Sequence, residues 1–472
     1  MPFRGVRYAP ARVGELANVT SPPYDVIGPG TLGRLRAASP YNIVRLILPE
    51  PETSPAAPEG ELPWAFRADP RAVGQLAAAL LRAWLDDGVL EVDDLPTLYV
   101  YEQCGPGQEQ RGLIGLVQVG TTAIHPHEDV MPGPVAGRRE LMAAVRGNLE
   151  PILLVYNGGG GAGGHGGAAG AAGGGRAEDA GSAADAGRSG IARESASTTS
   201  RLVDWTAEQR IPLACAVTDD GVTHRLWALT DPAEHAAIAA DLAARTALIA
   251  DGHHRYAAYE ELRASVRGAG EGDGPWDFGL AFLVDADEYP LRLGPIHRVI
   301  PHLNPAEAAR LAGQAFAVTE LTGTGTDLPG DDGQLADALG RLADAGQQGT
   351  AFLLAGRDGL RLLSRPDAVQ LAEAMPSGAS PRWQALDASV MQELLLARLW
   401  SIKDNDRDVL IAHDAEEAVR LAVETGGTAV LCNPMGLAAV TDLAAHGERV
   451  PRKSTSFGPK PRTGLVLRTF DA

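Results

Sequence analysis

A long stretch rich in glycine and alanine interrupts the chain at residues 157–190, and it constrains every fold that the sequence can adopt. It reads NGGGGAGGHGGAAGAAGGGRAEDAGSAADAGRSG. Such a composition buries too little apolar surface to offset the entropy lost on ordering, so we expect residues 157–200 to form a disordered insertion. The strand-like run PILLVYN precedes it and the helix-like run SRLVDWTAEQR follows it. Because both flanks look like parts of one core, we expect the fold to continue across the insertion.

The rest of the chain predicts three structured regions. Residues 1–156 form an N-terminal α/β region, residues 201–300 complete the same core, and residues 301–472 form a C-terminal α/β region; a length of 472 residues suits about two to three domains. Hairpin signals, such as LPTLYVYEQC followed by RGLIGLVQV, alternate with amphipathic helices such as AVGQLAAALLRAWL. The predicted fold class is therefore α+β, with mixed sheets and helices rather than one doubly wound sheet.

Charge and cysteine content restrict the partners and the compartment. The formal net charge is −19, from 60 acidic and 41 basic residues, which argues against binding to nucleic acid or to an anionic membrane surface. The three cysteines lie far apart without a CxxC pair, which fits a reducing compartment and gives no cysteine metal site. The sequence contains no apolar run of about 18 residues, and MPFRGVRYAPARVGEL has no signal-like apolar core. We expect a cytoplasmic protein whose partner is a small molecule.

The most unusual motif is Asp-Gly-His-His-Arg at residues 251–255, within TALIADGHHRYAAYEELR. The apolar strand TALIAD runs into it and a helical pattern follows. His253, His254 and Arg255 are thus predicted at a helix N-terminus, where free N–H groups and the helix dipole favour an anion. Two imidazoles and a guanidinium add charge-assisted hydrogen bonds suited to phosphate oxygens. The motif predicts a phosphate-binding site.

Asp251 has several possible roles in this motif. It can hold Mg²⁺, orient a histidine or accept a proton. The alternative is that Asp251 caps the helix and that the two histidines are polar surface residues. A zinc site is disfavoured because adjacent histidines on a helix point about 100° apart and the i, i+4 spacing of zinc proteases is absent.

Three further segments are candidates for the same chemistry. In AIHPHEDVMPGP, His125 and His127 share one face of an extended segment and Glu128 is a candidate proton acceptor; the alternative is a polar loop fixed by prolines. RVPRKSTSFGPKPRTGLVL gathers basic residues around Ser454 and Thr455, but it lacks a Walker sequence, so it is not a P-loop, and a solvated basic segment is the alternative. In NVTSPPYDVIGPG, two prolines hold Asp25 on a rigid turn, where it serves either a ligand or metal, or only the turn.

These segments carry a family resemblance. SPPYDVI, NIVRLILP, HPHEDVMPGPVAGRRELMAAVRGNLEPILLVY, ADGHHRYAAY, LGPIHRV, LDASVMQELLL and KSTSFGPKPRTGLV occur in this order and resemble the bacterial and archaeal family known as domain of unknown function 1015. The stretch ADGHHR is also similar to the motif of free serine kinases of the ParB/sulfiredoxin-like superfamily. The resemblance implies a ParB/sulfiredoxin-like core with additional α/β segments, and a kinase that transfers phosphate from ATP or ADP to free L-serine with Mg²⁺.

The hypothesis of a small-molecule kinase gives each candidate residue an expected role. Glu128, Asp251 and His253 are expected to be catalytic, with Asp25 an alternative proton acceptor, and Asp251 and Asp25 are expected to bind the metal. The nucleotide is expected to contact His254, Arg255, Lys453, Ser454, Thr455, His125 and His127. Two other functions are left open: a metal-dependent phosphohydrolase that uses His125, His127 and Asp251, and a nucleotide-binding regulatory protein without enzymatic activity.

Overall fold

The computed structural model describes residues 1–51, 65, 68–105, 107–159, 196–321, 332–403 and 408–471. Most of the predicted disordered insertion at 157–200 lies outside these residues. The contacts divide the chain into two compact units. Unit 1 consists of residues Met1–Ile124, Val130–Leu291 and Pro459–Ala472, and unit 2 of residues His125–Asp129 and Arg292–Gly458. The chain therefore contributes a short segment, His125–Asp129, to unit 2, builds the rest of unit 2 from Arg292, and returns to unit 1 at Pro459.

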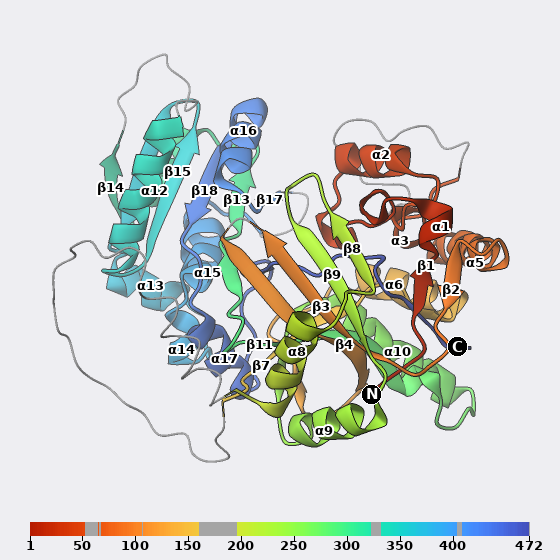
Figure 1. Cartoon of the computed structure of the whole chain (residues 1–472). Helices are drawn as coiled ribbons and strands as arrows, with labels where there is room; N and C mark the ends of the chain where they lie inside the picture. Colours follow the sequence, from red (N-terminus) through yellow and green to blue (C-terminus); the bar gives the residue numbers. More distant parts are fainter. Residues whose placement is uncertain are drawn as a thin grey trace, which may run out of the picture. The chain divides into compact units, whose positions relative to one another are not determined.

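Unit 1 mixes strands and helices along its whole length (Figure 1). In chain order its elements are β1 (Val6–Tyr8), α1 (Pro10–Val13), η1 (Leu16–Asn18), η2 (Tyr24–Val26), α2 (Pro29–Ala38), α3 (Val44–Ile47), α5 (Pro70–Asp86), β2 (Leu90–Val92), β3 (Leu98–Gly105), β4 (Gln108–Gln118), β5 (Ile124–His125, its last residue counted with unit 2), α6 (Pro132–Val145), β6 (Gly147–Asn148), β7 (Ile152–Tyr156), α8 (Thr198–Gln209), β8 (Ala214–Val217), β9 (Thr223–Leu229), α9 (Pro232–Leu242), β10 (Ala247–Asp251), α10 (His253–Gly268), η3 (Pro275–Asp277), β11 (Phe278–Asp285) and β20 (Arg468–Thr469).

The centre of unit 1 is an eight-stranded sheet with the order β5-β10-β7-β11-β4-β3-β9-β8. Strands β7 and β11 run parallel, whereas β10–β7 and β11–β4 are antiparallel. Strands from both sides of residues 157–200 therefore alternate in one sheet. The predicted mixed α+β architecture is confirmed.

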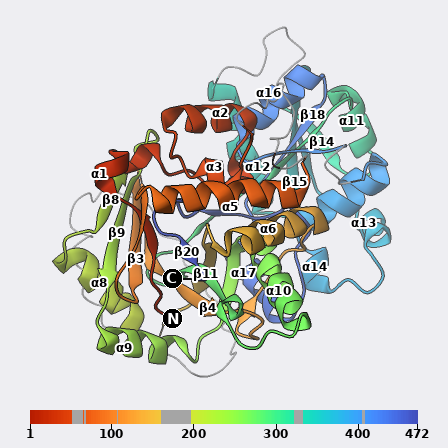
Figure 2. The same cartoon turned by 90° about the vertical axis from the view of Figure 1, so that its right-hand side faces the viewer.

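Helices cover one face of this sheet, which we call the helix face. Its strand residues include Leu98, Val100, Leu113, Ile152 and Leu154, and they pack against α6, α8, α9 and α10. Helices α5, α6 and α10 lie side by side in that order (Figure 2). Helix α5 forms because the Asp69 side chain accepts a hydrogen bond from Arg71 N (3.0 Å) and apolar residues then recur at helical spacing.

The opposite face of the sheet, which we call the tyrosine face, carries Tyr99, Tyr101, Gln103, His224 and Phe282. The pairing register places them together, because Gln103 lies opposite His224 and successive residues of a strand alternate between faces. The Tyr101 hydroxyl lies 2.9 Å from His224 Nδ1, and the Tyr101 and Phe282 ring centroids are 4.9 Å apart. The tyrosine face is thus polar towards the end of β3.

Unit 2 is built on a six-stranded sheet with the order β14-β16-β15-β18-β13-β17. Alternate residues of its strands pack against α12 and α16 on one face, and against α11 and the π-helical segment η4 on the other. Its elements are β12 (Arg292–Gly294), β13 (His297–Ile300), α11 (Pro305–Ala312), β14 (Ala317–Glu320), α12 (Asp332–Gly346), β15 (Ala351–Gly356), β16 (Gly359–Ser364), α13 (Ala368–Ala374), α14 (Pro381–Gln384), α15 (Asp387–Val390), η4 (Met391–Leu399), β17 (Leu410–Ala412), α16 (Ala415–Thr425), β18 (Thr428–Cys432), α17 (Leu437–Ala445) and β19 (Ser456–Gly458).

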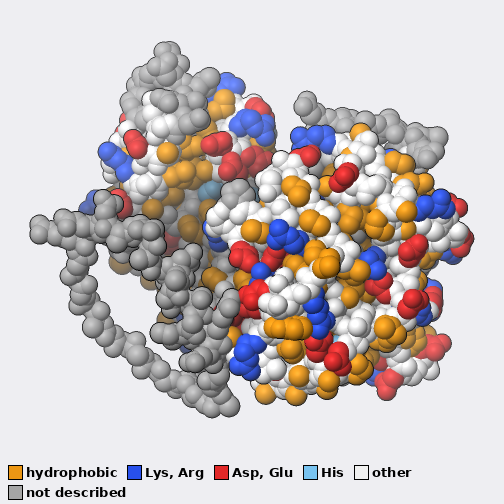
Figure 3. Space-filling model, in the orientation of Figure 1, with side chains coloured by type: hydrophobic (Ala, Val, Ile, Leu, Met, Phe, Trp, Pro, Cys, Tyr) orange, Lys and Arg blue, Asp and Glu red, His pale blue; other side chains and the backbone are white. Residues whose placement is uncertain are grey.

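Acidic and basic side chains lie next to one another on the face of unit 1 that Figure 3 shows. Many of these charges are paired; Arg111, for example, contacts Glu102 (2.5 Å) and Asp204 (2.9 Å). Among the described residues, no helix is both long enough and apolar enough to cross a membrane.

Candidate functional site

The Asp-Gly-His-His-Arg motif joins β10 to α10, so the strand and helix predicted around it are both present. Gly252 makes the turn with φ at 93°, a left-handed conformation that L side chains rarely adopt. A Cβ there would lie 3.0 Å from Ile152 Cγ2. Helix α10 therefore starts directly at the end of the strand, with His253 and His254 in its first turn.

A β-bulge in β10 decides the direction in which Asp251 points. Ile249 pairs with Leu154 of β7, but Asp251 pairs with Leu153, so Ala250 is an extra residue. Paired residues share a face of the sheet, and Leu153 lies on the face opposite to Leu154. The bulge therefore turns Asp251 away from the helix face and onto the tyrosine face, a re-aiming that bulges often produce beside functional sites.

On the tyrosine face, the buried side chain of Asp251 is part of a charge cluster. Lys460 Nζ lies 2.7 Å from Asp251 Oδ1 and 3.1 Å from Asp25 Oδ2. The other oxygen of Asp251 pairs with the Arg255 guanidinium, which also donates to Pro151 O (2.5 Å). Arg255 is only 1% exposed. Two carboxylates and two cations thus balance one another.

The cluster keeps its two cations protonated. Burial by itself lowers the pKa of Lys460, but Asp251 and Asp25 outweigh it and raise the pKa above its usual value. Burial likewise opposes the charge of Arg255, and the carboxylates of Asp251 and Glu150 overcome it and raise its pKa. Lys460 is therefore a cation across the physiological pH range.

A second buried acid, Glu150, holds the turn that carries Asp25. Glu150 accepts a hydrogen bond from Tyr24 N (3.0 Å) and lies 3.7 Å from Arg138. The Arg138 guanidinium lies over the Tyr24 ring, 4.2 Å from its centroid. Burial raises the pKa of Glu150. The turn predicted from Pro22 and Pro23 is thus fixed next to Lys460.

Lys460 also lines a pocket of about 360 Å³ in unit 1. This volume is within the range of small-molecule sites. The walls come from the Pro22–Val26 segment, the β3–β4 and β8–β9 hairpins and the segment after Pro459. The lining residues are Pro22, Pro23, Val26, Gln103, Gly105, Gln108, Asp220, Val222, His224, Pro459, Lys460 and Arg462.

The pocket combines basic groups with a neutral histidine. Burial lowers the pKa of His224 to about 4, and the neighbouring Arg462 contributes to this shift. Burial opposes the ionisation of Asp220, but hydrogen bonds from Thr218 and from the backbone of Val222 outweigh it and lower the Asp220 pKa. Arg462 is held by Thr20, to which its Nε donates (3.0 Å). The wall thus contains two cations, Lys460 and Arg462, and one acid, Asp220.

The two predicted metal ligands, Asp25 and Asp251, are brought together around Lys460. Carboxylate oxygens are suitable ligands for Mg²⁺. Here, however, an ammonium group lies between them, and Arg255 balances the remaining charge. Within the described ranges, no group of three or more His, Cys, Asp or Glu side chains is arranged to hold a metal ion. The cluster as folded does not fit a resident Mg²⁺.

The two histidines of the motif differ in their surroundings. Met131 N donates to His254 Nε2 (3.1 Å), so that ring nitrogen carries no proton and holds the start of α6. His254 consequently has one nitrogen fewer to offer to a phosphate. His253 is half-buried in the first turn of α10.

The remaining predicted residues form a separate cluster in unit 2. Glu128 Oε1 accepts a hydrogen bond from Lys453 N (2.7 Å), and His127 Nε2 lies 2.9 Å from Thr455 Oγ1. The Ser454 hydroxyl donates to Pro451 O (2.6 Å). Two segments predicted from the sequence therefore meet, and their polar groups stabilise the loop after Val450. His125 is half-buried at the end of β5.

Sequence reasoning missed most of the pocket in unit 1. It noticed Lys460 and Arg462 only as members of a basic stretch and selected Lys453 from it. It gave Asp220 and His224 no role. The one signal in the sequence that pointed to the pocket was the basic stretch itself. Its first part belongs to unit 2, and its last part, from Pro459, belongs to unit 1 and lines the pocket.

Comparison with solved structures gives weak similarities. A free serine kinase in complex with AMP is 13% identical with a TM-score of 0.31, over 73% of this chain and 87% of that chain. C-terminally truncated SbnI from Staphylococcus aureus is 10% identical with a TM-score of 0.32, over 73% and 82%. A conserved hypothetical protein from Pyrococcus furiosus is 12% identical with a TM-score of 0.33, over 78% and 99%. Because these identities and TM-scores are low, the similarities carry no functional argument, and a function has to be inferred from the side chains of this chain.

Comparison of the sequence gives a family. No curated protein matches it. Residues 1–162 and 190–389 match the family described as protein of unknown function (DUF1015), and these ranges cover more than half of the chain. The family predicted from the ordered motifs is therefore confirmed, and the chain belongs to the DUF1015 family.

Proposed function

We propose that the chain is a phosphotransferase that moves a phosphoryl group from ATP or ADP to the hydroxyl group of a small molecule, with free L-serine as the first acceptor to test. One observation carries this proposal: Lys460 contacts the motif carboxylate Asp251 and also lines the 360 Å³ pocket. The motif and the pocket thus belong to one site. The pocket is of a size for a small ligand, and its basic groups suit phosphate.

Lys460 and Arg462 neutralise phosphate charge in this proposal. Phosphoryl transfer requires mainly positioning and the stabilisation of charge on the phosphate oxygens. Lys460 is a point charge fixed by two carboxylates, and the Arg462 guanidinium is held by Thr20. Because both cations are fixed in the folded protein, little reorganisation is needed when an anion binds.

Asp25 is the proton acceptor that the geometry favours. In the reaction, the acceptor oxygen forms a bond to phosphorus, the bond from phosphorus to the nucleotide oxygen breaks, and the hydroxyl proton passes to a carboxylate. Asp25 is 28% exposed in its side chain, and its neighbours in the sequence, Pro22, Pro23 and Val26, line the pocket. Asp251 is 7% exposed and holds two cations, so it acts as a positioning residue for Lys460. No step depends on a protein-bound metal ion.

The experiment is incubation of the full chain with ATP or ADP, Mg²⁺ and L-serine, followed by mass spectrometry for O-phosphoserine. We expect phosphoserine from the parent protein and a loss of about tenfold or more in Lys460→Met, because a charged contact to phosphate is removed. Lys403→Met, at an exposed lysine of unit 2, is the matched control and should keep the activity.

Three results would contradict the proposal. Release of inorganic phosphate without an acceptor identifies a phosphohydrolase. Nucleotide binding without transfer to any member of a panel of small hydroxyl compounds identifies a binding protein. Equal activity of Lys460→Met and Lys403→Met removes the site from the reaction.

A further inference from the structure

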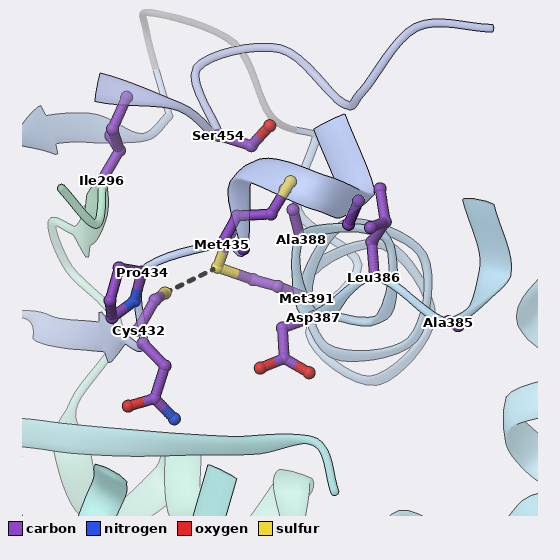
Figure 4. Close-up of a pocket in the computed structure, with 13 residues that line it drawn as sticks. Ile296, Ala385, Leu386, Asp387, Ala388, Met391, Cys432, Pro434, Met435 and Ser454 are labelled. Carbon is purple, nitrogen blue, oxygen red and sulfur yellow. Dashed lines mark hydrogen bonds between the residues drawn. The ribbon is translucent and has the colours of Figure 1, made fainter. Parts of the chain in front are cut away.

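Unit 2 contains a cavity of its own, of about 220 Å³. It lies where β18 ends, between the loop that leads into α17 and the start of α15 and η4 (Figure 4). Its lining residues are Ile296, Ala385, Leu386, Asp387, Ala388, Met391, Cys432, Asn433, Pro434, Met435, Gly436, Ala439 and Ser454. Nothing in the proposed phosphotransferase reaction uses this cavity.

Most of the wall is apolar and polarisable. Ile296, Leu386 and Met391 are buried, and Met391 Sδ lies 3.6 Å from Cys432 Sγ. Figure 4 shows the side chains of Met391 and Met435 next to each other. Thioether side chains adapt to ligands of different shapes because they are unbranched and polarisable. Such a wall favours the apolar body of a small molecule.

One carboxyl group is placed in this apolar wall. Burial raises the pKa of Asp387, although a hydrogen bond with Thr350 opposes that shift. The thirteen described residues that line the cavity include no lysine, arginine or histidine. A cationic group in the cavity would therefore gain an ion pair with Asp387 and would restore the charged form that burial disfavours. An anionic group would meet repulsion instead.

The backbone beside the cavity has an unusual helical form. Met391, a lining residue, is the first residue of the nine-residue π-helical segment η4, which follows the α-helical turn α15 directly. π-helical turns are rare and are often found at functional sites. This change of helical form begins in the wall of the cavity, between Asp387 and the buried face of η4.

We propose that the cavity of unit 2 binds a small molecule with an apolar body and one ammonium group, with Asp387 as the partner of the ammonium and Met391 and Met435 as contacts of the body. This site is independent of phosphoryl transfer, because all of its residues belong to unit 2.

The test uses three probes with the same branched body: isoamylamine, isoamyl alcohol and isovalerate. The full chain is labelled at the methionine methyl groups, and NMR follows the Met391 and Met435 signals, which are assigned with Met391→Leu and Met435→Leu. We expect isoamylamine to shift both signals saturably and isovalerate to leave them unchanged. Asp387→Asn should weaken isoamylamine about tenfold and leave the weaker binding of isoamyl alcohol unaltered.

The control is Asp344→Asn, at an exposed acid of α12 in the same unit, which should bind isoamylamine like the parent. The proposal is overturned if no probe moves the two methionine signals, or if isoamylamine and isoamyl alcohol bind equally well to the parent. It is also overturned if Asp387→Asn, shown by its unchanged remaining methionine spectrum to be folded, binds isoamylamine as tightly as Asp344→Asn does.

Discussion

Asp251 Oδ1 lies 2.7 Å from Lys460 Nζ, while the second oxygen of Asp251 pairs with Arg255. One carboxylate thus joins the motif after β10 to a segment that the chain reaches only after all of unit 2. Asp251 is buried, whereas Asp25, the other partner of Lys460, is partly exposed.

The unequal burial of the two acids predicts unequal losses of stability. Asp251→Asn leaves the buried Arg255 and the partly buried Lys460 short of a partner and should lower the free energy of unfolding of unit 1 by about 3 kcal/mol. Asp25→Asn should lower it by about 1 kcal/mol or less, because its pair is partly solvated. Urea unfolding of both variants checks this, and equal losses would show that Asp251 does not organise the cluster.

A substitution at Arg255 should affect the stability of unit 1 but not its affinity for a ligand. Lysine at this position keeps the charge but cannot reach both Pro151 O and Asp251 with a planar fork, so Arg255→Lys should cost about 2 kcal/mol of stability. Because the Arg255 side chain is almost completely buried, the affinity of the Arg255→Lys variant for ATP should stay within about threefold of that of the parent. Calorimetric titration with ATP and a urea melt measure the two quantities. A large loss of ATP affinity with unchanged stability would instead give Arg255 the phosphate-binding role expected from the sequence.

His224 predicts a pH dependence of the stability of unit 1. Its pKa falls from 6.5 to about 4 in the folded protein because burial disfavours the imidazolium. Between pH 6.5 and about pH 4 the unfolded chain binds a proton that the folded protein does not bind, so stability is lost as the pH falls through this window. The loss from this group is on the order of 3 kcal/mol. His224→Asn should lose less stability than the parent between pH 7 and pH 4, measured by urea unfolding of unit 1. A parallel pH profile in the variant would contradict the assignment.

Lys453 predicts a stabilising substitution. Its φ is 52°, in the left-handed region, while its backbone N–H donates to Glu128. Glycine accepts this conformation without a Cβ penalty, so Lys453→Gly should keep the hydrogen bond and raise the thermal stability of unit 2 by up to about 1 kcal/mol. The same variant tests activity, because it removes the Lys453 side chain and keeps the backbone hydrogen bond. If the variant still forms phosphoserine, the lysine side chain is not needed for the reaction. If it no longer forms phosphoserine but is as stable as the parent, the role expected for Lys453 from the sequence is supported.

The sequence predicted local structure well and side-chain direction poorly. The strand and helix around Gly252 follow from apolar runs and a glycine turn, and both are present. The direction of Asp251 depends on the extra residue Ala250, which shifts the register by one and leaves no mark in the hydrophobic pattern. In the same way, LDASVMQELLL has the spacing of an α-helix, but its second part, from Met391, is π-helical, and Leu394, Leu395 and Leu396 are all buried in the core of unit 2.

The pocket of unit 1 was hidden from sequence reasoning for a topological reason. The basic stretch 449–462 looks continuous, but the chain passes from unit 2 to unit 1 between Gly458 and Pro459. Lys453 and Lys460 therefore belong to different units, although only six residues separate them. No periodicity marks that crossing, so only the three-dimensional contacts show which lysine meets Asp251.

This return of the chain also sets an order of assembly during protein synthesis. A ribosome completes residues 292–458 before it adds Lys460, so a nascent chain carries Asp25, Asp251 and Arg255 for a long interval without their second cation. Unit 2 has all of its residues once Gly458 has been added, when unit 1 still lacks residues from Pro459 onwards. Unit 1, although it is begun first, thus obtains its ligand-binding Lys460 only after unit 2 is complete. A ribosome stalled before residue 460 would hold a chain in which the lysine-containing site of unit 1 does not yet exist.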